Sequence, residues 1–182
     1  MSETGLSDKI DFENTMENLF QLAIKSEWNS RRFYIQFSRI FDHVPEVSHF
    51  WLTLANDEEQ HAKTLQEIQD SLSKEILAQE ADRKLIKNIM NILSDLSKIS
   101  IDQVKNLDDA YEIAHEIETS EVNNVFRILT ENFIADKNKK ETIISDLLNH
   151  VEKLMKLSEN YGNKTWRKEI TPNHLVSASH TN

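Results

Sequence analysis

Apolar residues recur along most of the chain in alternating steps of three and four, the spacing of one face of an α-helix. This pattern predicts four long helices, over residues 12–41, 45–72, 107–133 and 139–162. Pro45 suits the first turn of the second helix, and Gly162 suits a C-terminal cap of the fourth. Because the chain holds only two glycines and two prolines, little interrupts the backbone between these positions. We therefore expect an all-α protein.

The connection between the second and third predicted helices spans about 34 residues. That length is too great for a tight hairpin, and residues 82–96 form an amphipathic segment of their own, so we expect a crossover that carries a helix. The apolar flank of this segment could pack on the bundle or on a second subunit; it comprises Leu85, Ile86, Ile89, Met90, Leu93 and Leu96. Residues 1–162 then form a four-helix bundle, and residues 163–182 a C-terminal tail with Trp166 as its candidate anchor.

Ionisable residues interrupt the apolar stripe of every long helix near its middle. They are Glu27 in the first helix, Glu58 and His61 in the second, Glu118 and Glu121 in the third, and His150 in the fourth. If the helices pack through their stripes, all of these side chains meet in one layer of the bundle.

Such a layer is costly to bury without a cation. An ionised carboxylate in a protein interior costs several kcal/mol, and neighbouring carboxylates repel each other. Protons could neutralise some of them, but polar atoms would still need partners in the core. A single glutamate or histidine on a stripe is more often an edge position or a satisfied core residue, whereas coincident interruptions in four helices favour a metal site.

Composition narrows the chemistry further. The chain has 31 acidic and 21 basic residues, a net charge of −10, and no Lys/Arg cluster that would track a phosphate backbone, so we expect no nucleic-acid partner. The absence of cysteine excludes disulfides, iron–sulfur clusters, Cys-ligated zinc and thiol catalysis, and leaves N and O ligands for any metal. With no signal-peptide pattern and no long apolar run, we expect a cytoplasmic protein without a membrane partner.

Two segments of the first half resemble the ferritin-like, rubrerythrin-type di-iron carboxylate proteins. They are AIKSEWNSRRFY, with Glu27 and Tyr34, and LANDEEQHA, with Glu58 and His61. The second half is similar to the same pattern in AHEIETSE and LLNHVEKL. Glu118 follows Glu27 by 91 residues, and His150 follows His61 by 89, as in a duplicated helix pair. The resemblance covers roughly residues 12–161.

The resemblance implies a non-haem iron oxidoreductase that reduces peroxide or O₂, with Glu58 as bridging ligand. Glu27, Glu118 and Glu121 would bind as terminal carboxylate ligands, and His61 and His150 would supply the nitrogen ligands. Tyr34 would hydrogen-bond one of these ligands. Two irons are implied, or one if the second position is lost. Manganese fits the carboxylate and imidazole ligands nearly as well. Without cysteine there is no rubredoxin module in this sequence, so electrons would come from an external donor protein; we also expect a homodimer or a higher homo-oligomer.

Two positions depart from the family pattern. A second E-x-x-H motif would need glutamate at position 147, where this chain has Leu147, and the expected aromatic after Glu118 falls at Val125 or is displaced to Phe126. Without a carboxylate at 147, the second metal position is impaired. Leu147 therefore keeps a rival interpretation open, a ferritin-like binding or scaffold protein with one metal or none. Iron storage is a third, and it requires a shell-forming oligomer.

Overall fold

The computed structural model describes residues 14–161, and its regular structure is helical. In chain order the elements are α1 (Met16–Ile40), α2 (Pro45–Ser71), α3 (Lys74–Leu77), α4 (Arg83–Lys98), the 3₁₀ turn η1 (Ile101–Gln103), α5 (Leu107–Glu118), α6 (Glu121–Phe133) and α7 (Lys137–Tyr161). Within the described residues, β-structure is limited to an isolated bridge between Thr15 and Glu80. The all-α prediction is confirmed, while Gly162, Trp166 and the predicted tail lie outside the described residues.

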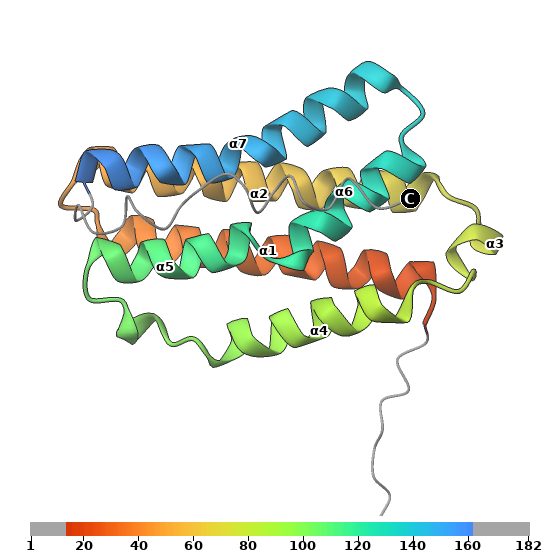
Figure 1. Ribbon diagram of the computed structural model, residues 1–182, viewed down its shortest axis with the longest axis horizontal. Helices are drawn as coiled ribbons and strands as arrows, with labels where there is room; N and C mark the ends of the chain where they lie inside the picture. Colours follow the sequence, from red (N-terminus) through yellow and green to blue (C-terminus); the bar gives the residue numbers. More distant parts are fainter. Residues whose placement is uncertain (1–13, 162–182) are drawn as a thin grey trace, which may run out of the picture.

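The long helices form a bundle in which α1 and α2 pack against each other as a hairpin, and α7 packs along α5 and α2 (Figure 1). The chain returns from α2 to α5 through α3 and α4, so the predicted crossover is confirmed. Helix α4 lies along the outside of α1 and also contacts α6 (Figure 1). Its apolar flank, with Ile86, Ile89 and Leu96 buried, therefore packs on the bundle of the same chain.

Local side-chain bonds explain where several helices begin. The Thr15 hydroxyl accepts a hydrogen bond from the backbone N–H of Asn18 and so caps α1. Pro45 occupies the first turn of α2, as the sequence predicted. Asn106 and Asp109 form a reciprocal capping box at the start of α5. The caps of α1 and α5 satisfy backbone N–H groups that lack partners within the helix, whereas Pro45 has no backbone N–H to satisfy.

The prediction of one continuous helix over 107–133 is wrong, because the chain breaks between α5 and α6 at Thr119 and Ser120. The Thr119 hydroxyl donates to the carbonyl of His115 at 2.6 Å, and the Ser120 hydroxyl donates to that of Ile117 at 2.7 Å. Such side-chain bonds compete with helical backbone hydrogen bonds. Glu118 is consequently the last residue of α5 rather than a mid-helix residue.

The core consists of two apolar clusters with a polar layer between them. The first cluster includes Phe20, Ala23, Ala62, Leu65, Phe126 and Leu147, and the second includes Tyr34, Phe37, Trp51, Leu54, Ala114 and Leu154. Along α1, α2 and α7 the polar residues fall between members of the two clusters: Glu27 between Ala23 and Tyr34, for example, and His150 between Leu147 and Leu154. The core thus isolates the polar layer from solvent along the bundle axis.

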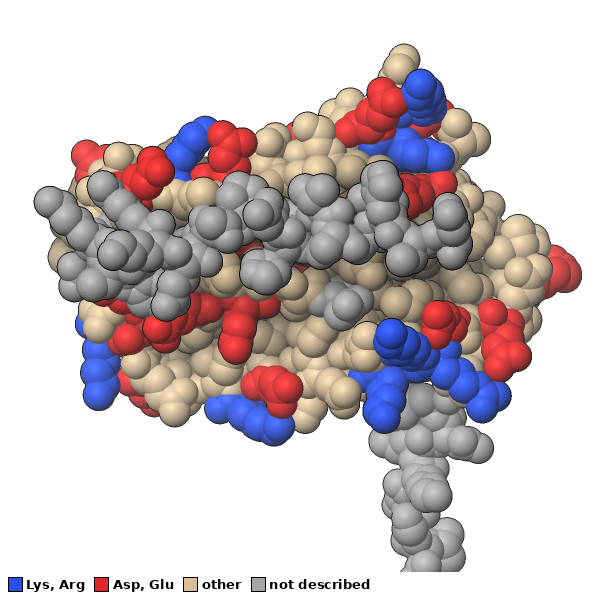
Figure 2. Space-filling view, in the orientation of Figure 1, with Lys and Arg blue, Asp and Glu red and all other residues tan. Residues whose placement is uncertain are grey.

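Charged side chains of both signs are interspersed over the face shown in Figure 2. Many lysines and arginines of the described residues pair with acidic residues one helical turn away, as in the contacts Lys63 to Glu59 and Arg127 to Glu131. Exposed pairs of this kind contribute little to stability, about 0.5 kcal/mol or less each. Over the described part of the chain, the helices are too polar or too short to traverse a lipid bilayer.

Candidate metal centre

The polar layer contains five buried side chains from four helices. They are Glu27 of α1, Glu58 and His61 of α2, Glu118 of α5 and His150 of α7, each no more than 5% exposed. These are five of the six residues that the sequence predicted as metal ligands. The sixth, Glu121, begins α6, but its side chain lies outside the described residues, and its role stays a prediction.

Glu58 lies between the two imidazole rings. Its Oε2 is 3.4 Å from Nδ1 of His61, and its Oε1 is 3.2 Å from Nδ1 of His150. The ring centroids are 5.0 Å apart. Glu58, His61 and His150 each offer one ligand atom, all within 4.8 Å of one another, so this group could hold a metal ion.

A further glutamate faces each imidazole from a neighbouring helix. Oε2 of Glu27 lies 3.7 Å from Nδ1 of His61, and Oε2 of Glu118 lies 3.4 Å from Nδ1 of His150. Each ring therefore presents Nδ1 to Glu58 and to one other carboxylate. This arrangement is approximately symmetric about Glu58, as expected for a duplicated helix pair.

The outer contacts of the layer are not symmetric. Glu118 accepts hydrogen bonds from the Tyr34 hydroxyl at 2.6 Å and from the Asn123 side-chain amide at 3.1 Å. Tyr34 thus bonds one of the predicted ligands, as the family resemblance implied. Oε1 of Glu27, by contrast, is buried without a hydrogen-bond partner among the described residues. Glu118 is oriented more firmly than Glu27.

In the metal-free protein, only protons balance the negative charge of the buried carboxylates, and the two imidazoles are therefore protonated and cationic. Burial alone lowers the pKa of His61, but its contacts with Glu27 and Glu58 outweigh burial and raise it to about 10. Burial likewise opposes protonation of His150, yet Glu118, Asp57 and Glu58 raise its pKa to about 12. Burial and the nearby Glu58 raise the pKa of Glu27 well above its usual range. The pKa of Glu58 is held well below its usual range because Glu27 and the two histidines outweigh its burial.

Protons alone leave this layer poorly satisfied. Among the described residues, Nδ1 of His61 and both ring nitrogens of His150 are buried without a hydrogen bond of acceptable geometry, although carboxylate oxygens lie nearby. Buried polar atoms without partners are costly. A divalent cation would accept one lone pair from Nδ1 of each ring together with lone pairs of the nearby carboxylate oxygens. The donor set of carboxylates and imidazoles, without thiolate, suits iron or manganese.

One side of the layer is apolar where the duplication would place another carboxylate. Leu147 is buried in the first cluster, and the ring of Phe126 lies 4.8 Å from that of His61. Val125 and Phe126 are both fully buried, so the aromatic displaced to position 126 still belongs to the core. At this side, therefore, the candidate ligands among the described residues are His61 and Glu27, and α7 offers none.

Sequence reasoning missed two residues that contact the layer, Asn123 and Asp57, and a third, Lys153, that contacts Asp57. Asn123 bonds both the carbonyl and the carboxylate of Glu118, and Asp57 and Lys153 lie behind His150. Asp57 and Lys153 fall beside the apolar stripes, so helical periodicity alone gives them no weight. A useful signal would have been that Asp57 and Lys153 carry opposite charges. Asp57 directly precedes the predicted ligand Glu58, and Lys153 follows the predicted ligand His150 by one helical turn.

The crossover bundle with buried carboxylates and imidazoles places the chain in the ferritin-like class of all-α proteins. The family model described as Rubrerythrin matches residues 17–158, and the chain belongs to the rubrerythrin family, a ferritin-like group of di-iron domains. Comparison with curated proteins and with solved structures gave no match.

Proposed function

We propose that this protein is an iron-dependent oxidoreductase that reduces peroxide or O₂ at the polar layer. The observation that carries the proposal is the cluster of Glu58, His61 and His150, three buried groups with ligand atoms in mutual reach, inside a rubrerythrin-family bundle. Carboxylates on both sides of this cluster supply the negative charge that divalent cations require.

Five described side chains would hold the iron. Glu58 would bind between the two positions, Glu27 and His61 on one side, and Glu118 and His150 on the other, each imidazole through Nδ1. Bound ferrous iron would supply the electrons that break an O–O bond. The two apolar clusters exclude bulk water from the layer, so these electrons are protected from side reactions.

Tyr34 has a defined part in this proposal. Its hydroxyl is fully buried and donates to Glu118, so it fixes one carboxylate oxygen and leaves Oε2 facing His150. Burial and the Glu118 charge raise the pKa of Tyr34 well above its usual range. The phenol therefore keeps its proton at neutral pH and acts as a permanent hydrogen-bond donor.

Leu147 supports a second candidate function, a protein that binds one metal ion and performs no two-iron chemistry. Leu147 packs in the first apolar cluster, at the position where the family motif would supply a second bridging carboxylate. A single ion bound by His150, Glu58 and Glu118 would satisfy the better oriented half of the layer. Iron stoichiometry distinguishes the two candidates.

The test is anaerobic titration with Fe(II), followed by rapid mixing with one equivalent of H₂O₂ or O₂. The proposal expects two irons per chain and oxidation much faster than that of free Fe(II) in the same buffer. His115→Ala is the matched control, because His115 belongs to another E-x-x-H sequence but is only partly buried and stacks on Tyr111. One bound iron with slow oxidation would favour the binding protein. Oxidation no faster than in buffer at full loading would refute the enzyme.

An external electron donor and self-association remain part of the proposal. The reduced state must be restored after each turnover, and this sequence contains no cysteine for an iron–sulfur centre. A donor protein would have to transfer electrons through the bundle surface. Turnover with a chemical reductant in place of the donor would separate the chemistry at the layer from the identity of that partner.

A further inference from the structure

A charged pair lies directly behind His150, on the side away from the predicted metal ligands. Nζ of Lys153 is 2.5 Å from Oδ2 of Asp57, and the same oxygen is 3.3 Å from Nε2 of His150. Lys153 follows His150 by three residues on α7, so the two side chains share one helix face. Asp57 reaches them from α2.

The two ring nitrogens of His150 consequently face different surroundings. Nδ1 faces the buried carboxylates of Glu58 and Glu118. Nε2 faces Asp57, whose side chain is 32% exposed and whose charge is already paired with Lys153. Nε2 lies within 3.3 Å of Asp57 but outside hydrogen-bond geometry in the metal-free chain. A cation in the layer would take Nδ1, and Nε2 would then keep its proton toward Asp57.

Among residues 14–161, this support is present for one of the two histidines, His150. Asp146 stands at the position that corresponds to Asp57 in the duplicated pattern, but its side chain is exposed. The two halves of the layer therefore differ in the residues behind their imidazoles. The α7 half has a carboxylate held in place by a lysine.

We propose that Lys153 is a positioning residue for metal binding, because it holds Asp57 against Nε2 of His150 and so directs Nδ1 into the layer. This inference rests on the proposed metal site. Carboxylates that orient a metal-binding imidazole typically contribute 10- to 100-fold to metal affinity. Lys153 contacts Asp57 rather than the imidazole itself, so we expect it to contribute at the lower end of this range, about tenfold in metal affinity.

Simple charge repulsion makes the opposite prediction. A lysine near a cation site disfavours cation binding, so removal of its charge should tighten binding if electrostatics alone operates. Positioning through Asp57 predicts weaker binding. The sign of the change separates the two explanations.

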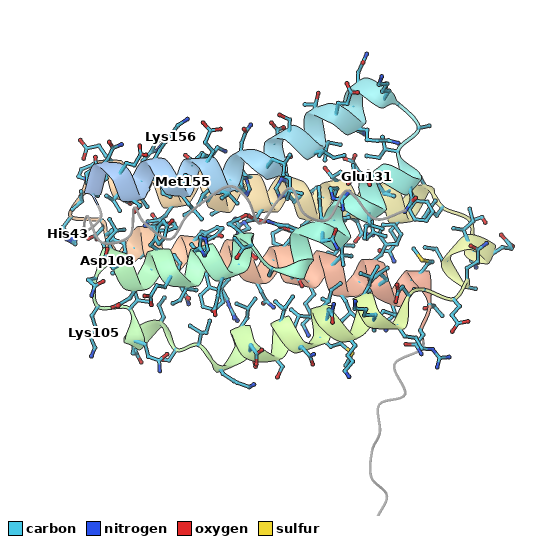
Figure 3. All side chains as sticks on the ribbon, in the orientation of Figure 1. His43, Lys105, Asp108, Glu131, Met155 and Lys156 are labelled. Carbon is cyan, nitrogen blue, oxygen red and sulfur yellow. The ribbon has the colours of Figure 1, made fainter. Side chains whose placement is uncertain are left out.

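The test is anaerobic Co(II) titration, followed by the visible absorption of the bound ion, on the full chain. Lys153→Met should weaken Co(II) binding about tenfold, and Lys153→Arg should restore most of it because the charge and hydrogen bonds are kept. Lys156→Met is the matched control. Lys156 lies one turn further along α7, points outward (Figure 3) and pairs with Glu152 at 2.7 Å, so its removal should leave Co(II) affinity unchanged.

A double variant tests whether Lys153 acts through Asp57. Asp57→Asn should weaken Co(II) binding by at least as much as Lys153→Met, and adding Lys153→Met to it should change little. In the Zn(II)-loaded protein, the Nε2 proton of His150 should exchange with water faster in Lys153→Met than in the parent, as seen in imidazole ¹⁵N NMR spectra.

Unchanged or tighter Co(II) binding in Lys153→Met, with the parent binding normally, would overturn this inference and leave the proposed function intact. Additive losses in the double variant would also overturn it, since Lys153 would then act independently of Asp57. A parent protein that binds no Co(II) would overturn the metal site and the role of Lys153 together.

Discussion

The hydroxyl of Tyr34 donates a 2.6 Å hydrogen bond to Oε1 of Glu118, although 84 residues separate them in sequence. The bond joins α1 to the last residue of α5, immediately before the chain breaks at Thr119. Glu118 could otherwise move with this helix end. The bond therefore fixes a carboxylate of the polar layer from the opposite half of the duplicated pattern.

Tyr34→Phe should destabilise the metal-free protein by about 1 to 3 kcal/mol, because it leaves a buried carboxylate oxygen without its donor. Asn123 still bonds the other oxygen of Glu118, which limits the loss. Urea denaturation measures the change. Tyr161→Phe is the control, since Tyr161 is 48% exposed and should shift the unfolding free energy by less than about 0.5 kcal/mol. Equal stability of the parent and Tyr34→Phe would mean that this bond contributes nothing.

The fold was predictable because the apolar stripes of the long helices are clear and almost free of glycine and proline. The ionisable residues that interrupt these stripes are also buried where the structure describes their side chains: Glu27, Glu58, His61, Glu118 and His150 all lie in the core. Whether they bind metal stays a prediction, and so does any role of Glu121.

Local and long-range polar bonds were beyond the reach of periodicity. At the break, the hydroxyl groups of Thr119 and Ser120 hydrogen-bond to backbone carbonyls rather than to solvent. A hydrophobic pattern does not show which of these partners a hydroxyl group takes. Asp57 and Lys153 are 96 residues apart. Their contact follows from the rotation of α7 against α2, which sequence spacing does not fix.

His61→Ala should abolish most of the stabilisation that metal gives the folded protein. In the parent, free metal at 100 times its dissociation constant should add about 2.7 kcal/mol to the unfolding free energy. The variant lacks one of the grouped ligand atoms and should gain far less at the same concentration. Melting temperatures with Co(II) and with a chelator give the comparison, and His115→Ala should keep the parent's full difference. A His61→Ala variant that gains as much as the parent would remove His61 from the site.

Metal affinity should rise with pH. The raised pKa values of His61 and His150, about 10 and about 12, mean that both rings are protonated in the metal-free protein at neutral pH. The metal-bound form holds fewer protons, so a higher pH favours it. Release of one proton per ring would raise the affinity by up to about a hundredfold per pH unit. Titrations with Co(II) at pH 6.5 and 7.5 measure this slope, and a pH-independent affinity would show that the imidazoles do not lose protons on binding.

Leu147→Glu tests the position on the apolar stripe of α7 where the duplicated pattern would place the glutamate of a second E-x-x-H motif. The new carboxylate would lie three residues before His150, on the same face of α7, beside the first apolar cluster. If the parent binds its second iron weakly, the variant should hold two irons tightly under anaerobic Fe(II) titration and consume peroxide faster. Without metal the variant should be less stable than the parent by on the order of several kcal/mol, because it buries an additional charge.

Leu148→Glu is the control for this substitution, because Leu148 is 49% exposed and a carboxylate there stays in solvent. It should change neither the iron stoichiometry nor the metal-free stability appreciably. A parent that already binds two irons tightly and consumes peroxide as fast as Leu147→Glu would show that Leu147 impairs nothing. A variant that remains destabilised and binds no additional iron would instead favour the single-metal binding protein, because the apolar wall beside His61 would then be unable to form a second site.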